Sequence, residues 1–432
     1  MNAIWFWNPV TRLLFLKPPQ MKTALQLVTV LFIVATAAHA QVTPEATAST
    51  AQLHYSARYA QNSDFLGSSL GDSQDAILSG TLAYTNGVKR LPFALTYGGG
   101  YSWNLAGIAY DNGLFENVMF SQGIVGRSWN IQASDNVSYR KTAPTTGFSG
   151  VPGTGEPVGE PNPPPSSSQT ILTLNTRTVN NIVSGEFEHS LNYSTALSVG
   201  GSSELLRYPD GDGLDTDGQT MNALLTRRLT ARNSLSGQYL FSEFSYPGNN
   251  LAQATSSFVT NSALFGYQRE WNRRITTNAS IGPQWIGSSN SAVVPFSTTV
   301  SGSAKIDDQF RFGSASLDYS HAASGGSGFL LGAEVDSVSA DFSRDFERKL
   351  TMGLTGGYRR TSSLDNEGEI NGKFGSAMAT LRLSPTLTAF ANYTAMDQST
   401  SYALPANALT SLQQVMSFGI AYSPRGKRLN TQ

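Results

Sequence analysis

Apolar side chains recur at every second position in many segments between Ala51 and Tyr422. In the segment 350–358, one face would carry Leu350, Met352, Leu354, Gly356 and Tyr358. Because successive side chains point to opposite faces only in a strand, this period predicts β-strands. About eighteen such segments can be counted, at approximately 51–60, 74–85, 91–104, 114–125, 127–140, 171–190, 195–207, 219–229, 233–246, 257–270, 275–287, 293–306, 310–322, 329–343, 350–362, 370–383, 387–397 and 413–422.

The connections between these segments alternate between short and long. The short ones are expected at Gly126-Arg127, Thr230-Ala231-Arg232, Trp271-Asn272-Arg273-Arg274, Ile306-Asp307-Asp308, Phe346-Glu347-Arg348 and Ser384-Pro385-Thr386. Longer ones lie between them, such as Tyr208–Gln219 and Ser399–Ser411. This alternation is typical of transmembrane barrels. The sequence therefore predicts an all-β fold, a transmembrane antiparallel β-barrel of about 18 strands (16–18), with short periplasmic turns and long extracellular loops.

Composition excludes several other classes of protein. Charged residues make up 14% of the chain and hydrophobic residues 40%, and the mean hydropathy is −0.20. Beyond the N-terminus no apolar run is long enough for a membrane-spanning helix, which excludes a helical membrane protein. A net charge of −1 gives no electrostatic case for binding nucleic acid. The chain has no cysteine, so disulfides and thiolate chemistry are excluded.

The N-terminus has the pattern of a secretory signal peptide. Lys22 precedes the apolar run Ala24–Ala35, and Ala38-His39-Ala40 forms a cleavage site before Gln41. The alternative is a membrane anchor, but the apolar run is too short to span a bilayer. We expect four parts: a signal peptide over 1–40, in which 1–20 would be an extension upstream of the start at Met21, a periplasmic segment over 41–50, the barrel over 51–422, and a periplasmic tail over 423–432.

Aromatic residues cluster near the ends of the predicted strands. Examples are Tyr97, Tyr101, Trp103, Tyr267, Trp271 and Trp285. Such residues form girdles at both membrane interfaces of barrels, although aromatic side chains also favour strands in general.

The last predicted strand carries a family resemblance. In 415–422, Met416, Phe418, Ile420 and Tyr422 share one face, and the alternate positions are small or polar. The chain resembles a bacterial outer-membrane β-barrel, porin-like in size, whose last strand serves as an assembly signal ending on an aromatic residue. The resemblance implies a location in the outer membrane, with its lipid, lipopolysaccharide and assembly machinery as partners. The chain departs from the family in the tail that follows, Ser423–Gln432.

Two loops are candidate sites. The segment Lys141–Thr170 is rich in Pro and Gly and follows the fifth predicted strand, where porin loops often constrict the pore; the alternative is a solvated extracellular loop. The loop 210–218 places four carboxylates between glycines, Asp210, Asp212, Asp215 and Asp217. Calcium prefers such oxygen ligands, but the spacing lacks a complete EF-hand pattern, so a hydrated turn is the alternative to a calcium loop.

Charged residues on the predicted inner faces are candidates for lining a pore. They are Arg58, Arg140, Arg359, Arg382, Glu186, Glu188, Glu204 and Glu334. Such side chains would select solutes by charge, or they would pair across the lumen and fill it. Their signs are nearly balanced, so the sequence indicates no preference for anions or cations.

No catalytic constellation is predicted, and no cofactor apart from the calcium hypothesis. His189 and His321 fall on the lipid-side register, while His54 falls on the lumen side among serines that lack a nucleophile-elbow motif. We therefore expect a channel and not an enzyme: passive or facilitated diffusion of small hydrophilic solutes across the outer membrane. The alternatives are a barrel in a surface-polysaccharide or secretion system, or a structural or adhesive barrel with ligand-binding loops.

Overall fold

A computed structural model describes most of the predicted barrel. The described residues are 49–64, 73–86, 88–106, 113–141, 177–210, 214–247, 256–288, 294–325, 330–347, 349–365, 368–401, 412–424 and 427–429. The predicted signal peptide and the segment Lys141–Thr170, except Lys141 itself, lie outside this part. Within it, no helix is long and apolar enough to span a membrane.

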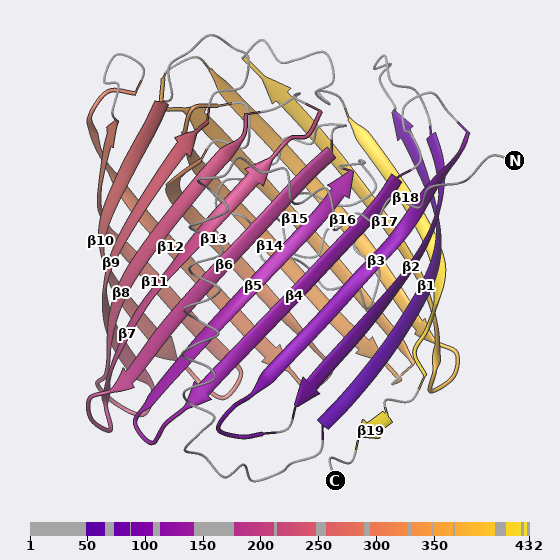
Figure 1. The fold of residues 1–432 in the computed structure, drawn as a ribbon, viewed down its shortest axis with the longest axis horizontal. Helices are drawn as coiled ribbons and strands as arrows, with labels where there is room; N and C mark the ends of the chain where they lie inside the picture. The colour runs from indigo at the N-terminus through magenta and orange to yellow at the C-terminus, as the bar shows by residue number, and fades with distance from the viewer. Residues whose placement is uncertain are drawn as a thin grey trace, which may run out of the picture. The chain divides into compact units, whose positions relative to one another are not determined.

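Eighteen long strands form one antiparallel sheet (Figure 1). Their bounds are β1 Ser49–Asp64, β2 Ser73–Asn86, β3 Phe93–Ala106, β4 Gly113–Val125, β5 Trp129–Lys141, β6 Arg177–Ser190, β7 Thr195–Arg207, β8 Thr216–Arg228, β9 Asn233–Tyr246, β10 Ser256–Glu270, β11 Ile275–Ser288, β12 Ser297–Phe310, β13 Gly313–Ser324, β14 Ala333–Phe346, β15 Leu350–Ser363, β16 Glu369–Arg382, β17 Leu387–Thr400 and β18 Gln413–Tyr422. This confirms the predicted all-β antiparallel barrel and its strand count.

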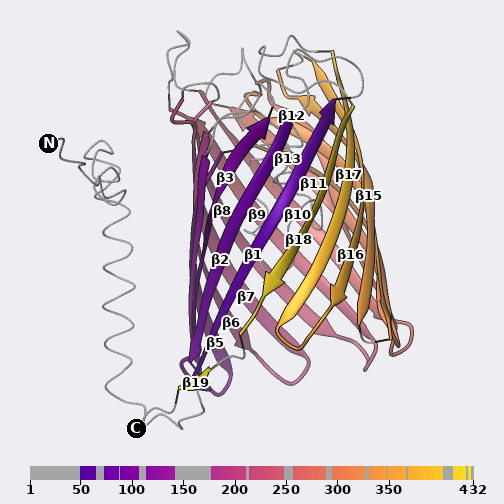
Figure 2. The same ribbon diagram turned by 90° about the vertical axis from the view of Figure 1, so that its right-hand side faces the viewer.

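The sheet closes on itself, because every strand pairs with its neighbours in sequence and the last pairs with the first. β1 is hydrogen-bonded to β2 and also to β18, in a register that runs from Tyr55↔Tyr422 to Asp64↔Gln413. The two strands lie side by side in Figure 2. An antiparallel pair satisfies its own backbone donors and acceptors, so closure leaves no unpaired edge in the wall. A closed wall is what a β-sheet needs to cross a lipid bilayer.

The short turns all lie at one end of the barrel, which we call the short-turn end; the other is the long-loop end. They follow β2, β4 and each later even-numbered strand up to β16, as predicted. One predicted turn is wrong: Asp307 and Asp308 belong to β12, which continues to Phe310. The strand continues because its backbone stays paired on both sides, with Ile275 of β11 opposite Asp308 and Gly313 of β13 opposite Phe310. Each carboxylate has a cation nearby, Lys305 at 3.4 Å from Asp307 and Arg274 at 3.2 Å from Asp308.

The predicted tail 423–432 contains a short strand. β19, Lys427–Leu429, pairs antiparallel with Ser49–Ala51 at the start of β1. β1 therefore has a second pairing partner at the short-turn end, beyond the last residue of β18 and next to the β1–β18 pair that closes the barrel.

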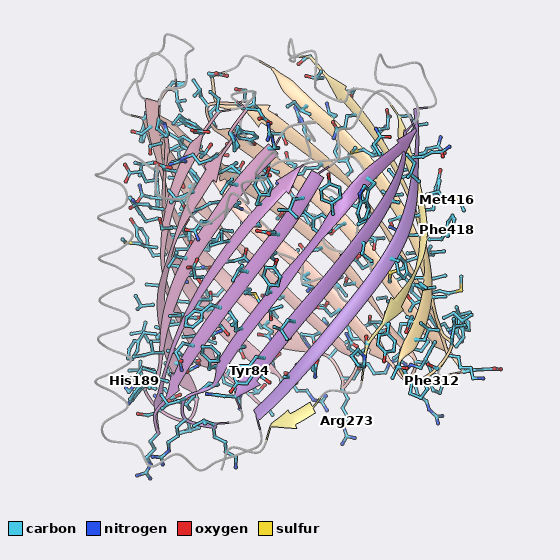
Figure 3. The ribbon with its side chains drawn as sticks, turned by 45° about the vertical axis from the view of Figure 1, so that its right-hand side comes forward. Tyr84, His189, Arg273, Phe312, Met416 and Phe418 are labelled. Atoms are coloured by element: carbon cyan, nitrogen blue, oxygen red, sulfur yellow. The ribbon has the colours of Figure 1, made fainter. Side chains whose placement is uncertain are left out.

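Apolar side chains cover the outer face of the barrel. Cross-strand partners share a face, so Leu354 on β15 lies with its partners Phe342 and Ala377. Phe418 on β18 is 52% exposed, and Figure 3 shows Met416 and Phe418 pointing away from the wall. Solvent exposure of apolar side chains on this scale is unfavourable in water but suits contact with lipid. The architecture is that of an outer-membrane barrel, and the predicted location in the outer membrane agrees with it.

Aromatic side chains mark the strand ends on this outer face. Near the short turns, the Arg269 guanidinium lies 3.9 Å from the Trp271 ring centroid, and Arg344 lies 5.1 Å from Phe346. At the long-loop end, Trp103 and Trp285 are exposed on the outer face. Rings with an apolar body and a polar edge favour the membrane–water interface. The positions fit the predicted girdles at both ends.

Replacing an outward apolar residue at mid-strand with arginine should destabilise the barrel. Ile281 is 63% exposed near the middle of β11. We expect Ile281→Arg to lower the free energy of unfolding in lipid vesicles by about 2–4 kcal/mol, because the guanidinium would lie in hydrocarbon. Reversible urea unfolding followed by tryptophan fluorescence measures the loss. Asn278→Arg, on the inner face of the same strand, is the matched control, and an equal loss there would contradict the assignment of faces.

Candidate functional site

The inner face of the barrel is lined mainly by short polar side chains. Serine and threonine hydroxyls pair directly across neighbouring strands, as Ser134 with Ser184 at 2.6 Å and Ser314 with Ser343 at 3.0 Å. A pocket of about 290 Å³ on β5–β8 is lined by Gln132, Ser134, Ser184, Gly185, Glu186, Gly200, Gly201, Ser202, Thr220 and Asn222. Short hydroxyl and amide side chains leave room for water and offer it donors and acceptors. The inner face can therefore hold hydrophilic solutes in water.

Carboxylates stand out on this inner face along β12, β13 and β14. Lys305 is the cross-strand partner of Asp318, and its ammonium lies 3.4 Å from the Asp307 carboxylate. On β14, Asp341 accepts a hydrogen bond of 2.7 Å from Thr355, and Asp345 accepts one of 2.6 Å from Thr351. Lys305 is thus shared by two carboxylates of this stretch of wall, Asp307 and Asp318.

At the long-loop end the inner face changes from polar to apolar. Phe244, Tyr246, Phe258 and Ile286 point inward from β9, β10 and β11 and are buried together with the loop residue Val294. The Phe244 and Phe258 rings stack with their centroids 5.0 Å apart. A second cluster joins inward residues of β7, β14 and β16 to two residues outside the strands, in the set Leu206, Tyr208, Leu330, Ala333, Val335 and Ile370. We call these two clusters together the mouth core.

Connections of the long-loop end are pinned to this mouth core. Gly332 adopts φ +93°, and a Cβ there would approach Phe258 and Leu364 to 2.8 Å. The backbone N–H of Leu364 donates to the Gly332 carbonyl at 3.2 Å. The Tyr246 hydroxyl donates to the Gly325 carbonyl at 2.9 Å. Described parts of three long connections are therefore folded onto the inner face of β9–β11, and they narrow this end of the barrel.

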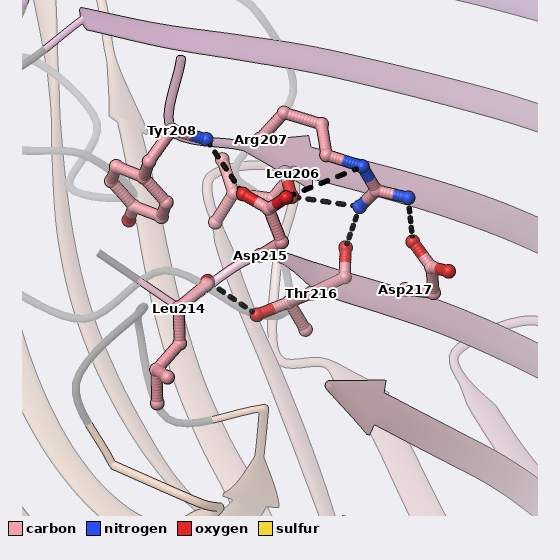
Figure 4. Close-up of polar contacts among 7 residues, drawn as sticks. All are labelled: Leu206, Arg207, Tyr208, Leu214, Asp215, Thr216 and Asp217. Atoms are coloured by element: carbon pink, nitrogen blue, oxygen red, sulfur yellow. Dashed lines mark hydrogen bonds and ion pairs between the residues drawn. The ribbon is translucent and has the colours of Figure 1, made fainter. Parts of the chain in front are cut away.

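Arg207 organises the β7–β8 connection (Figure 4). Its guanidinium binds Asp217 in an ion pair, lies 3.9 Å from Asp215, and donates to the Thr216 carbonyl at 3.1 Å. Asp215 in turn accepts a hydrogen bond of 2.9 Å from the Tyr208 backbone N–H. Burial raises the pKa of the Tyr208 phenol above its usual range, and the Asp215 carboxylate raises it further.

These contacts occupy three of the four carboxylates predicted as a calcium loop. Asp215 and Asp217 face Arg207, whereas Asp210 forms an ion pair of 2.6 Å with Arg177. Asp212 lies outside the described residues. Among the residues that the structure describes, no group of three or more His, Cys, Asp or Glu side chains is arranged to hold a metal ion. The calcium hypothesis stays a prediction.

The predicted pore-lining residues divide between the two faces. Glu186, Glu188, Arg359 and Arg382 lie on the inner face by register, and Ser198 donates a hydrogen bond of 2.5 Å to Glu186. Glu204 also points inward but is only 4% exposed. The side chains of Arg58 and Arg140 lie outside the described part of the chain.

Glu334 lies on the outer face, contrary to its predicted place in the pore. It alternates with Ala333 and Val335, which point inward into the mouth core, and it shares the register of the exposed Val338. The prediction was wrong because both faces of β14 carry apolar and polar residues at this end, so alternation alone did not identify the inner one.

The histidines lie where the alternation placed them, except that the His54 side chain is outside the described residues. His321 Nδ1 lies 2.7 Å from Asp336 on the outer face, where the Tyr319 hydroxyl also reaches that carboxylate at 3.3 Å. His189 stacks on Phe187 with ring centroids 6.3 Å apart, also on the outer face. Neither histidine is therefore close to the polar inner wall.

Sequence reasoning missed the mouth core. The signal was present in the segment 239–246, where apolar residues occupy both faces of β9: Tyr239 and Phe241 on one, Leu240 and Phe244 on the other. In a strand that faces lipid on one side and water on the other, an inward aromatic ring would expose apolar surface to water. Two apolar faces at one strand end therefore indicate that a loop covers the inner one.

Comparisons with known proteins find similarity to solved structures alone. No family model and no curated protein matches the chain. Among solved structures, Acinetobacter baumannii OccAB3 matches with a TM-score of 0.47 and 10% identity, over 88% of this chain and 99% of that one. Pseudomonas aeruginosa OpdK, solved with vanillate, matches with 0.45 and 11%, over 88% and 99%. The Neisseria meningitidis FrpB iron transporter matches with 0.47 and 8%, over 88% and 83%.

Removing the central ring of the mouth core should release the loops packed on it. Phe258 is 1% exposed and contacts the rings of Phe244 and Tyr246. We expect Phe258→Ala to destabilise the mouth core by about 3–5 kcal/mol, through lost burial and the cavity left behind. Hydrogen exchange of the Leu364 amide should accelerate, while amides of mid-strand residues stay protected. Leu264→Ala, farther along β10 on the same face, is the control; unchanged exchange in Phe258→Ala would contradict the pinning of the loops.

Proposed function

We propose that the protein is an outer-membrane channel through which small hydrophilic solutes diffuse passively. The observation that carries this proposal is a closed ring of eighteen antiparallel strands with an apolar outer face and a polar inner one. A barrel of this strand number is wide enough to enclose an aqueous channel. Passage then needs no chemical step and no cofactor.

The geometry supports a filter based on size at the long-loop end. The mouth core fills part of the inner face of β7–β16 with buried side chains, held there by loop contacts such as Tyr246 to Gly325. Solutes would have to pass beside this core. Small molecules fit such a path better than a polymer does, so the channel for small solutes is preferred to an export conduit for polysaccharide.

Two other functions differ from the proposed channel in whether small solutes pass through the barrel. An export conduit or accessory of a surface-polysaccharide or secretion system would release a polymer, and a structural or adhesive barrel would use its loops to bind ligands. Neither needs a permanently open path for small solutes. Conductance therefore separates the three.

The purified protein should form stable, ohmic pores in a planar lipid bilayer. We expect discrete conductance steps, because the polar inner wall supports continuous water, and uptake of small neutral sugars into liposomes that contain the protein. The control is the same preparation after heat unfolding, which should migrate differently on a gel and give no steps. A folded, heat-modifiable barrel without conductance or sugar uptake would overturn the proposed channel.

A further inference from the structure

The alternation of the strands sorts the charges of this chain unequally between the two faces. In the half of the barrel next to the short turns, the described inner-face residues include seven carboxylates and three cations. The carboxylates are Glu186, Glu188, Glu270, Asp307, Asp318, Asp341 and Asp345; the cations are Arg228, Lys305 and Arg382. The inner wall of this half is therefore net negative, although the whole chain is close to neutral.

Arginines that could balance these carboxylates lie instead on the outer face and at the strand ends. Arg269 and Arg344 rest on aromatic rings of the outer surface, where they do not reach the interior. Three more arginines form ion pairs with carboxylates at strand ends: Arg177 with Asp210, Arg274 with Asp308, and Arg360 with Glu369. Each of these pairs cancels its own charge locally and leaves the inner wall unaffected.

The acidic side chains are also poorly neutralised where they lie. Asp318 faces Lys305 across the β12–β13 pair, but the same lysine contacts Asp307. Asp341 and Asp345 are bound by threonine hydroxyls, which stabilise the negative charge without removing it. A solute passing this half of the lumen would therefore meet a negative potential.

The basic residues of the short turns do not reverse this field. Arg127, Arg232 and Arg273 are exposed in the turns after β4, β8 and β10. Charges in bulk solvent are screened within about 8 Å at physiological ionic strength, whereas charges lining a pore with low-dielectric walls act on every ion that passes. The charges of the inner wall therefore influence which ions pass more strongly than the arginines of the turns do.

From this unequal distribution we infer that the lumen prefers cations, so that small hydrophilic cations are the favoured solute class. The inference rests on the proposed channel function. It assigns Asp307, Asp318 and Asp341 as residues that determine specificity, with Lys305 opposing them. The preference is strongest at low ionic strength, because salt screens the wall charges.

Reversal potentials in a potassium chloride gradient test this inference on the full-length protein in a planar bilayer. The unmodified channel should give a reversal potential of the sign that reports a cation-to-anion permeability ratio above one. The triple variant Asp307→Asn, Asp318→Asn, Asp341→Asn should lower that ratio at least about twofold, since one unit charge at about 10 Å in water already changes the local cation concentration by about that factor. Lys305→Gln should change the ratio in the opposite direction.

Two adjacent residues supply the matched control. Asp307 and Asp308 lie at the same depth of β12, but Asp308 is on the outer face in an ion pair with Arg274. Asp307→Asn should shift the reversal potential, and Asp308→Asn should leave it unchanged. Heat-modifiable migration confirms that each variant has folded.

The outcomes separate the two proposals. Stable pores with a ratio at or below one, or pores whose selectivity ignores all three aspartates, would overturn the cation preference and leave the channel intact. Absence of any conductance from a folded barrel would instead overturn the channel function on which the preference rests.

Discussion

The structure depends on satisfying the backbone hydrogen bonds of a β-sheet in lipid. Hydrocarbon offers no partner for an exposed N–H or C=O group, so a sheet can cross a membrane only if it has no free edge. The pairing of β1 with β18 meets this requirement, and β19 extends the pairing of β1 at the short-turn end. Once the ring is closed, each residue of a strand faces either lipid or the interior.

That division gives neighbouring residues opposite roles. Arg359 points to the interior, whereas Arg360 pairs with Glu369 on the outer face. Asp307 and Asp308 differ in the same way, one beside Lys305 and one beside Arg274. The net charge of the whole chain therefore says little about the electrostatic potential inside a channel, because that potential depends on the residues whose side chains face the interior. The negative inner wall emerges only after the residues are separated by face.

The mouth core is the main exception to the rule of a polar interior. Phe244 and Phe258 are buried inside the barrel because residues of the long connections cover them. Burying aromatic rings offsets part of the entropy lost when loops are ordered. The same packing that stabilises these loops also narrows one end of the barrel, so in the proposed channel one set of contacts would serve both stability and selectivity by size. The charge selection that we propose would instead take place in the opposite half.

The sequence by itself determined the fold class, the number and order of the strands and the residues that face lipid. These features are local, since a period of two residues and the length of each connection can be read along the chain; β18 was predicted at its observed bounds. Where the local pattern is ambiguous, only the tertiary structure decided the placement of a residue. It placed Asp307 in a strand, moved Glu334 to the outer face, and brought Gly332 against Phe258. The physical reason is that these placements depend on partners distant in sequence: the residues that pair with the strand on its two neighbours, or a loop that covers an inner face.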